Sequence, residues 1–507
     1  MPATPYISVV VTARNDNHGG NMLGRMQAFL DSWIGQSKLY NFPSEIIIVE
    51  WNPPVGRPKL IDDLRWPLET EPCHVRFIDV PAEIHQRLPS PDAIPLHQMI
   101  AKNVGIRRAR GEFILATNID IVFSRELMRF LAQRALEPGK LYRIDRHDVS
   151  KDIPREPSVD ELLDFCETHK LRVFTKEGTF TFDRDGLWNL EKNDIVAPDA
   201  GIRLQGGWFP VERASRGPYR WMEAETEVVL RRSRPRLLID VETGPSAGGK
   251  PVEVEVLDEG GATLGSTSLE GRCILRLHVP DRISSSRLRF RIHGRGVVIE
   301  RDLRFLNLRA FGLRWDSNGA AAKCGLEVLR RKSIPKLKAL ALRFRRPIQV
   351  GRIGSDWAQT EKACSPLSKI RNGAFLHTNS CGDFSLLSRH AWFALRGYAE
   401  FYIWPMHIDS LLCYAAYHSG IQEVVLSEPM RIFHIEHLTG AGWTPEGEAE
   451  RQGRIERKGV DAISYADVTQ WVAYMRRFDS PMIFNTCEWG LAGVQLAEMN
   501  PRLGPSP

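Results

Sequence analysis

The stretch that decides the fold runs from Asn103 to Asp120 and reads NVGIRRARGEFILATNID. It predicts a short helix closed by Gly111, followed by a buried strand over Phe113 to Ala116. Asn118 and Asp120 come directly after that strand. Ligands of open α/β sheets bind outside the carboxyl ends of the strands, so Asp120 is expected at a binding site. The oxygen ligands of an Asn-x-Asp suit a divalent cation that also bridges a diphosphate.

Strand and helix patterns alternate around this stretch, over residues 6–150. The apolar β runs are Ile7 to Thr12, Glu45 to Glu50 and Val75 to Val80, and helical spacing covers Asn21 to Gly35 and Gln98 to Arg110. The alternation predicts an α/β fold with a mostly parallel central sheet covered by helices. The same character returns from Phe375 onward.

The intervening residues have a different pattern. Between about 205 and 315, short alternating strands are separated by turns rich in Gly, Pro and Ser, such as Gly260-Gly261. This predicts an all-β sandwich inserted into one α/β domain. The predicted division is 1–150 (first half of the α/β domain), 151–204 (connecting segment), 205–315 (sandwich), 316–371 (basic linker or helical segment), 372–445 (second half) and 446–507 (helical extension).

Arg330 to Arg346 contains eight Lys or Arg and no acid. A solvated basic linker is the first interpretation of such a run. Peripheral contact with an anionic membrane surface or an acidic glycan is the second.

Composition narrows the class of protein. The 507 residues are 43% hydrophobic without a run of 18 apolar residues, so no transmembrane helix is expected. Eight scattered cysteines without a CxxC pair fit reduced thiols in a cytoplasmic protein. A net charge of +6 allows an anionic ligand, but no nucleic-acid-binding module is recognisable. P-loop and dinucleotide-binding GxGxxG motifs are missing.

Two further loops are expected beside Asp120. Thr12-Ala13-Arg14-Asn15 follows the first strand, and Glu50 ends the second. Parallel strands end at one edge of a sheet, so these loops together could hold a base, a ribose and a metal-bound diphosphate. The alternative for Glu50 is a surface acid at a strand end.

In this combination the chain resembles glycosyltransferases of the GT-A fold, family 2 in particular. The residues that carry the resemblance are Ala13-Arg14-Asn15, Glu50, Asn103-x-Gly105 with Arg110-Gly111, and Asn118-x-Asp120. It implies that the first loop, Glu50 and Asn103 belong to the nucleotide side, and that Asp120 binds Mn²⁺ or Mg²⁺. Two departures are present: Trp51-Asn52-Pro53 replaces the usual Asp-Gly-Ser, and the first acid of the metal motif is the neutral Asn118.

The resemblance continues in the C-terminal part. Cys381-Gly382-Asp383, Glu400 and Asp409 match the sequence around the family's acceptor site. An inverting transfer needs a carboxylate to deprotonate the acceptor hydroxyl. The resemblance implies Asp409 as that base, with Glu400 as the second candidate and Asp383 orienting hydroxyls. Asp409 could instead cap its helix, or do both.

The resemblance also implies a histidine that completes the metal site. His434 matches best, and His437 could substitute for it. A structural or solvent-facing histidine is the alternative.

The sequence therefore predicts an inverting, metal-dependent glycosyltransferase, a hexosyl- or N-acetylhexosaminyltransferase of polysaccharide biosynthesis. Its donor would be a nucleotide-sugar, by resemblance a UDP-sugar, and its acceptor a glycan or a lipid-linked glycan. A cytoplasmic enzyme at the inner face of a membrane is expected. The alternative is a non-catalytic carbohydrate-binding or scaffold protein with a decayed transferase domain.

Overall fold

The computed structural model describes most of the chain. The described residues are 4–183, 185–191, 194–197, 200–231, 234–279, 286–293, 297, 299, 304–316, 326–330, 376–437, 453 and 455–501.

The first sheet has the strand order β23-β6-β22-β4-β1-β2-β3-β25. Its strands are β1 (Ile7–Ala13), β2 (Ser44–Trp51), β3 (Cys73–Val80), β4 (Phe113–Ala116), β6 (Lys140–Ile144), β22 (Ser385–Ser388), β23 (Gln422–Leu426) and β25 (Ala497–Met499). β4, β1, β2 and β3 are parallel neighbours, as are β6 and β23. β22 enters antiparallel between β4 and β6, and β25 pairs antiparallel with β3.

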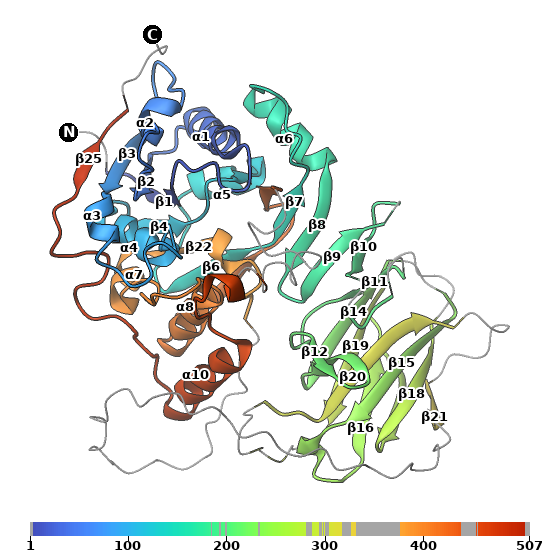
Figure 1. Ribbon diagram of the computed structural model, residues 1–507. Coiled ribbons are helices and arrows are strands. Elements are labelled where there is room, and N and C mark those ends of the chain that lie inside the picture. The colour runs from blue at the N-terminus through green and yellow to red at the C-terminus, as the bar shows by residue number, and fades with distance from the viewer. Residues whose placement is uncertain are drawn as a thin grey trace, which may run out of the picture.

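A second sheet runs in the order β10-β9-β8-β7-β24-β5. Its strands are β5 (Ile121–Phe123), β7 (Arg146–Val149), β8 (Lys170–Thr175), β9 (Gly178–Phe182), β10 (Trp188–Leu190) and β24 (Ile432–Ile435). β24 pairs antiparallel with β5 and parallel with β7. The predicted connecting segment therefore supplies β8 to β10, which extend this sheet toward the sandwich (Figure 1).

The predicted fold class, a mostly parallel central sheet of the GT-A type, is wrong. The described residues form four sheets in which most strand pairings are antiparallel, and 34% of these residues are in strands and 24% in helices. Parallel pairing among the described strands is confined to β1–β2, β2–β3, β1–β4, β6–β23 and β7–β24. The reason is that β22 and β25 join the first sheet antiparallel from distant parts of the chain, while short turns connect β8 to β9 and β9 to β10.

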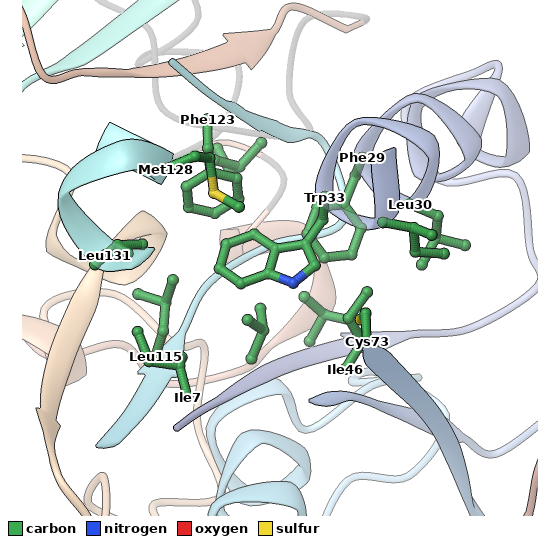
Figure 2. Close-up of a cluster of buried hydrophobic side chains, with 14 of the residues drawn as sticks. Ile7, Phe29, Leu30, Trp33, Ile46, Cys73, Leu115, Phe123, Met128 and Leu131 are labelled. Atoms are coloured by element: carbon green, nitrogen blue, oxygen red, sulfur yellow. The ribbon is translucent and has the colours of Figure 1, made fainter. Parts of the chain in front are cut away.

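Helices cover both faces of the first sheet (Figure 1). The helices are α1 (Met22–Leu39), α2 (Leu60–Asp63), α3 (Ala82–His85), α4 (Gln98–Arg108), α5 (Arg125–Ala132), α6 (Val159–Thr168), α7 (Arg389–Leu395), α8 (Ile408–His418) and α10 (Tyr465–Phe478). Of these, α6 packs against strands of the second sheet. α1 and α5 pack on one face with the core of Figure 2, and α4, α7, α8 and α10 pack in the other apolar cluster.

Trp33 is central to the first of these cores. Met22, Met26, Phe29 and Trp33 recur at helical spacing and are buried on one stripe of α1. The Trp33 indole lies edge-on to Phe123, with ring centroids 4.9 Å apart, and donates from Nε1 to Ser44 Oγ at 3.1 Å. It therefore joins α1 to both sheets (Figure 2).

The remaining two sheets form a sandwich at the lower right of Figure 1. One contains β11 (Ile202–Leu204), β14 (Glu225–Leu230), β16 (Val252–Leu257), β17 (Thr263–Leu269) and β19 (Ser286–His293). The other contains β12 (Glu212–Ala214), β13 (Gly217–Met222), β15 (Arg236–Thr243), β18 (Arg272–His278), β20 (Leu308–Trp315) and β21 (Leu326–Arg330). Alternate residues such as Val252, Val254 and Val256 point into a shared apolar core.

Two expectations concern membranes. Residues 331–346 of the basic segment Arg330 to Arg346 lie outside the described residues. Within the described part of the chain, no helix combines the length and the apolar character that crossing a bilayer requires.

Trp33→Ala should lower the free energy of unfolding by about 3–5 kcal/mol, because it leaves a large cavity between α1 and the two sheets. Leu39→Ala on the same helix is the matched control. Leu39 is 69% exposed, so the control should stay within about 0.5 kcal/mol of the parent protein. Urea unfolding followed by tryptophan fluorescence and circular dichroism measures both variants. Equal effects of the two substitutions would contradict this packing.

Candidate metal centre and its surroundings

Asp120 lies between the end of β4 and the start of β5, close to two histidines. Its Oδ2 is 3.3 Å from His437 Nε2 and 3.8 Å from His434 Nε2. The antiparallel pairing of β24 with β5 places His434 opposite Ile121, and His437 follows three residues later. One potential ligand atom from each of these three residues lies within 4.8 Å of the others. One carboxylate and two imidazoles in this arrangement could hold a divalent cation.

Asp148 on β7 orients His434 through the ring nitrogen that faces away from Asp120. Asp148 Oδ1 is 3.0 Å from His434 Nδ1. A proton on Nδ1 that is donated to Asp148 leaves the Nε2 lone pair facing Asp120, which is the tautomer that ligates a metal. Burial disfavours the imidazolium and Arg146 adds to this, but the charges of Asp148 and Asp120 outweigh them and raise the pKa of His434.

The Asp120 carboxyl is strongly biased toward its ionised form. Burial favours the neutral acid, yet the hydrogen bond from His437 and the charges of His434 and Arg25 hold the pKa of Asp120 well below its usual value. An ionised carboxylate is the form that binds a cation, so no proton has to leave Asp120 when a metal arrives.

Arg146 connects this group to the turn Cys381–Asp383 before β22. Its buried guanidinium is 2.7 Å from Asp383 Oδ2 through Nη1 and 2.9 Å from Asp148 Oδ1 through Nε. It also stacks on Phe174, 4.0 Å from the ring centroid. Asp383 is thus held by a buried ion pair.

Asn118 completes the same chain of contacts. Its Nδ2 donates to Asp383 Oδ1 at 2.5 Å, and its Oδ1 accepts from Gln98 Nε2 at 3.1 Å. Both ends of the amide are therefore engaged by protein side chains. In this arrangement Asn118 holds Asp383 in place, whereas the sequence predicted it as a direct metal ligand.

Asp409 lies in the first turn of α8 beside Gly382. A Cβ built at Gly382 would stand 2.8 Å from Asp409 Oδ2, so a side chain at this position would require the Asp409 carboxyl group to shift. The N-cap residue of α8 is His407, and Asp409 Oδ1 accepts from the backbone N–H of Ser410 at 2.9 Å. The interpretation of Asp409 as the N-cap residue is therefore wrong.

Lys102 of α4 is fully buried beneath the same turn. Its Nζ donates to the carbonyl of Gly382 at 2.8 Å. Burial lowers the pKa of Lys102 to about 8, although Asp383 and Asp409 favour its charged form. The lysine brings a positive charge to a region that contains several carboxylates.

Glu400 and Asn103 join the C-terminal part to α4. Asn103 is fully buried and exchanges hydrogen bonds with the backbone of Tyr398, 2.8 Å each. Its Nδ2 also donates to Glu400 Oε1 at 2.9 Å, and that oxygen accepts from the N–H of Gly490 at 2.7 Å. Burial raises the pKa of Glu400 despite these hydrogen bonds. In this structure the Asn103 and Glu400 side chains connect α4 to the backbone at Tyr398 and Gly490.

The predicted nucleotide-side residues lie around the ends of β1 and β2. Arg14 Nε donates to the carbonyl of Asn52 at 2.8 Å. Asn15 is buried and donates to Asp63 Oδ2 at 2.6 Å, which links the loop after β1 to the last residue of α2. Thr12 Oγ1 is buried without a hydrogen-bond partner, and the adjacent Ala13 is buried as well.

Glu50 is fully buried, so its interpretation as a surface acid is wrong. Both of its carboxylate oxygens accept from the N–H of Leu60, at 3.0 and 3.1 Å. Burial raises the pKa of Glu50 to about 7, and the nearby Asp79 acts in the same direction. The carboxyl thus anchors the start of α2 at the edge where the nucleotide base is expected.

Four charged residues of the site were missed by the sequence analysis. Arg146 and Asp148 alternate along the buried strand β7, and charges at positions i and i+2 of a buried strand point to an internal ion-pair network. Arg25 interrupts the apolar stripe of α1, and Lys102 is a buried charge on α4. A charged residue on an otherwise apolar face of a helix is a pattern that would have indicated Arg25 and Lys102.

Comparisons with known proteins do not assign the chain to a family. No family model and no curated protein matches it. Among solved structures, similarity is found to a family two carbohydrate esterase from Clostridium thermocellum in complex with cellohexaose, with 16% identity and a TM-score of 0.17 over 24% of this chain and 34% of that chain. An active-site mutant of a family two carbohydrate esterase from the same organism gives 14% identity and 0.17 over 24% and 32%. The chain spans about a third of the length of these structures. Neither similarity establishes a shared fold or an activity.

Asp120→Ala and His434→Ala should each abolish or strongly weaken Mn²⁺ binding, because each removes one ligand of the Asp–His–His group. Calorimetric titration of Mn²⁺ measures this loss. His390→Ala, which removes an exposed histidine of α7, should bind Mn²⁺ as the parent protein does. Unchanged Mn²⁺ affinity in Asp120→Ala would rule out this metal centre.

Glu50 should make stability depend on pH. The folded-state pKa of about 7 lies above the ordinary 4.5, so this carboxyl stabilises the fold fully below about pH 4.5 and loses that contribution as the pH rises through 7. The loss amounts to about 3 kcal/mol from the size of the shift. Glu50→Gln cannot ionise, so its stability relative to the parent protein should increase by up to that amount between pH 5 and pH 8.

Urea unfolding at the two pH values measures this difference. The control Glu69→Gln changes an exposed carboxyl and should show no such increase. A pH-independent difference for Glu50→Gln would mean that Glu50 ionises at its ordinary pKa.

Proposed function

We propose that this chain is an inverting, metal-dependent glycosyltransferase that moves a sugar from a nucleotide-sugar to a hydroxyl of a glycan or lipid-linked acceptor. The observation that carries the proposal is the Asp120–His434–His437 group, which the Asp383–Gly382 turn connects to the carboxylate of Asp409. A cation site and a separate partly exposed carboxylate are the two functional parts that such a transfer requires.

The donor side would use the loops after β1, β2 and β4. Asp120, His434 and His437 would hold the cation, and a bound divalent cation would stabilise the negative charge of the leaving nucleoside diphosphate. Mn²⁺ fits this ligand set better than Mg²⁺, because Mg²⁺ favours oxygen ligands only. The resemblance to family 2 glycosyltransferases supports a UDP-sugar with a hexosyl or N-acetylhexosaminyl group.

The acceptor side would use α8 and the turn before β22. Asp409 would remove the proton from the acceptor hydroxyl as its oxygen attacks the anomeric carbon from the face opposite the diphosphate. Lys102, Arg146 and Asn118 would hold Gly382 and Asp383 in place, so Asp383 acts as a positioning residue for Asp409. This assignment differs from the sequence-based expectation that Asp383 orients sugar hydroxyls directly.

A carbohydrate-binding scaffold is the second candidate, and one observation favours it. Aromatic side chains gather on the sandwich, where Tyr219 and Trp221 of β13 lie beside Phe311 of β20, with the Arg309 guanidinium over all three rings. Tyr219 and Trp221 are buried in this cluster, whereas Phe311 and Arg309 are partly exposed, so these two side chains could contact a glycan. A cytoplasmic location at the inner face of a membrane remains part of the first proposal.

Asp409→Asn should keep Mn²⁺-dependent binding of UDP but lose transfer by about 10²–10⁴-fold, because general-base catalysis typically contributes this much. Binding is measured by calorimetry, and transfer by release of UDP from a panel of UDP-sugars with candidate glycan acceptors. Asp92→Asn, at an exposed position, is the matched control and should transfer normally. Near-parental transfer by Asp409→Asn would contradict the assignment of the base. Glycan binding without any transfer by the parent protein would favour the scaffold.

A further inference from the structure

Arg25 contacts the carboxylate oxygen that would bind the cation. Its Nη1 lies 2.6 Å from Asp120 Oδ2, and the two side chains are only 4% and 9% exposed. That same oxygen is the one that His437 and His434 approach. In this structure the charge of Asp120 is therefore already neutralised by a side chain of the protein.

Arg25 also holds the loop that covers the metal centre. Its Nη2 donates to the carbonyl of His18 at 2.5 Å, and Nη2 and Nε contact the carbonyl of Gly20 at 3.3 and 3.4 Å. Between these residues, Gly19 has a φ of +72°, and a Cβ there would stand 2.8 Å from His437 Nδ1. One guanidinium thus links the loop after β1 to the ligand after β4.

A cation and Arg25 cannot both hold Asp120 without cost. A dication on Oδ2 would lie next to the guanidinium, and like charges repel strongly in a buried environment with a low effective dielectric constant. A polyanion that contacts both positive charges would remove this repulsion. A diphosphate is such an anion, and arginine is suited to phosphate oxygens because its planar donors can bind two of them at once.

We infer that Arg25 is a diphosphate-binding residue that keeps the cation affinity low until the anion is present. Without ligand, Arg25 neutralises Asp120. When metal and diphosphate bind, Arg25 turns from Asp120 to a phosphate oxygen, and the cation takes its place on Oδ2. This inference rests on the proposed metal site and adds a residue from α1 that couples the cation to the diphosphate.

If Arg25 couples the cation to the diphosphate, one substitution should change the Mn²⁺ affinity and the pyrophosphate affinity in opposite directions. Arg25→Gln removes the competing charge, so Mn²⁺ alone should bind about tenfold more tightly than to the parent protein. The same variant should bind inorganic pyrophosphate about tenfold more weakly in the presence of saturating Mn²⁺, because it lacks a charged phosphate contact. Calorimetric titrations of Mn²⁺, and of pyrophosphate into the Mn²⁺-loaded protein, measure the two affinities. A misfolded variant would lose both.

Two further variants complete the test. Arg25→Lys keeps the charge and should keep Mn²⁺ affinity within a few-fold of the parent value. Arg65→Gln alters an arginine that is 52% exposed and should change neither affinity. One contrary result is that Arg25→Gln leaves the Mn²⁺ affinity unchanged or weaker while Asp120→Ala abolishes Mn²⁺ binding. That result would refute the proposed role of Arg25 but would support the proposed metal centre. If the parent protein binds no Mn²⁺ with or without pyrophosphate, the metal centre and the role of Arg25 are both wrong.

Discussion

The candidate site depends on the buried guanidinium of Arg146, which neutralises two carboxylates from different sheets. Asp383 belongs to the turn before β22 in the first sheet, and Asp148 belongs to β7 in the second. Three buried charges are tolerated because each has an oppositely charged partner within hydrogen-bond distance. Removal of one partner would leave an uncompensated charge, at a typical cost of about 3–5 kcal/mol. This ion-pair cluster therefore fixes the relative position of the turn before β22 and the histidines.

The second sheet explains why the site forms at this place. β24 pairs with both β5 and β7, so His434 stands opposite Ile121 and beside Asp148. Residues separated by about three hundred positions in the sequence thereby surround one carboxylate, Asp120. The strands β8, β9 and β10, which extend the second sheet from β7, lie next to the sandwich (Figure 1). The sandwich is therefore adjacent to the sheet that carries His434.

The local parts of this arrangement could be predicted from the sequence. The apolar runs of β1, β2 and β4 and the apolar stripe of α1 have clear periodicities, and Asp120 follows a buried strand. The antiparallel positions of β22 and β25 could not be predicted, because they depend on pairing between distant segments that short-range patterns do not encode. That is why the expectation of a mostly parallel sheet failed.

The roles of individual polar residues were harder to predict. Glu50 and Asn103 were selected by motif, yet in the structure both are fully buried and hydrogen-bonded to backbone groups. A motif indicates which residue type a site needs at a given position. It does not show whether that residue contacts a ligand or stabilises a neighbouring loop. Arg25 and Arg146 belong to no motif, and their importance follows only from the tertiary contacts that neutralise Asp120, Asp148 and Asp383.

The central claim is that the Asp–His–His group forms one site together with a nucleoside diphosphate. Calorimetric titration of UDP, and in parallel GDP, CDP and ADP, into the purified protein with and without Mn²⁺ tests it most directly. The account predicts that one of the four binds with micromolar affinity when Mn²⁺ is present and at least tenfold more weakly when a chelator removes the metal. Binding of the same strength without metal, or no binding of any of the four with Mn²⁺, would contradict it.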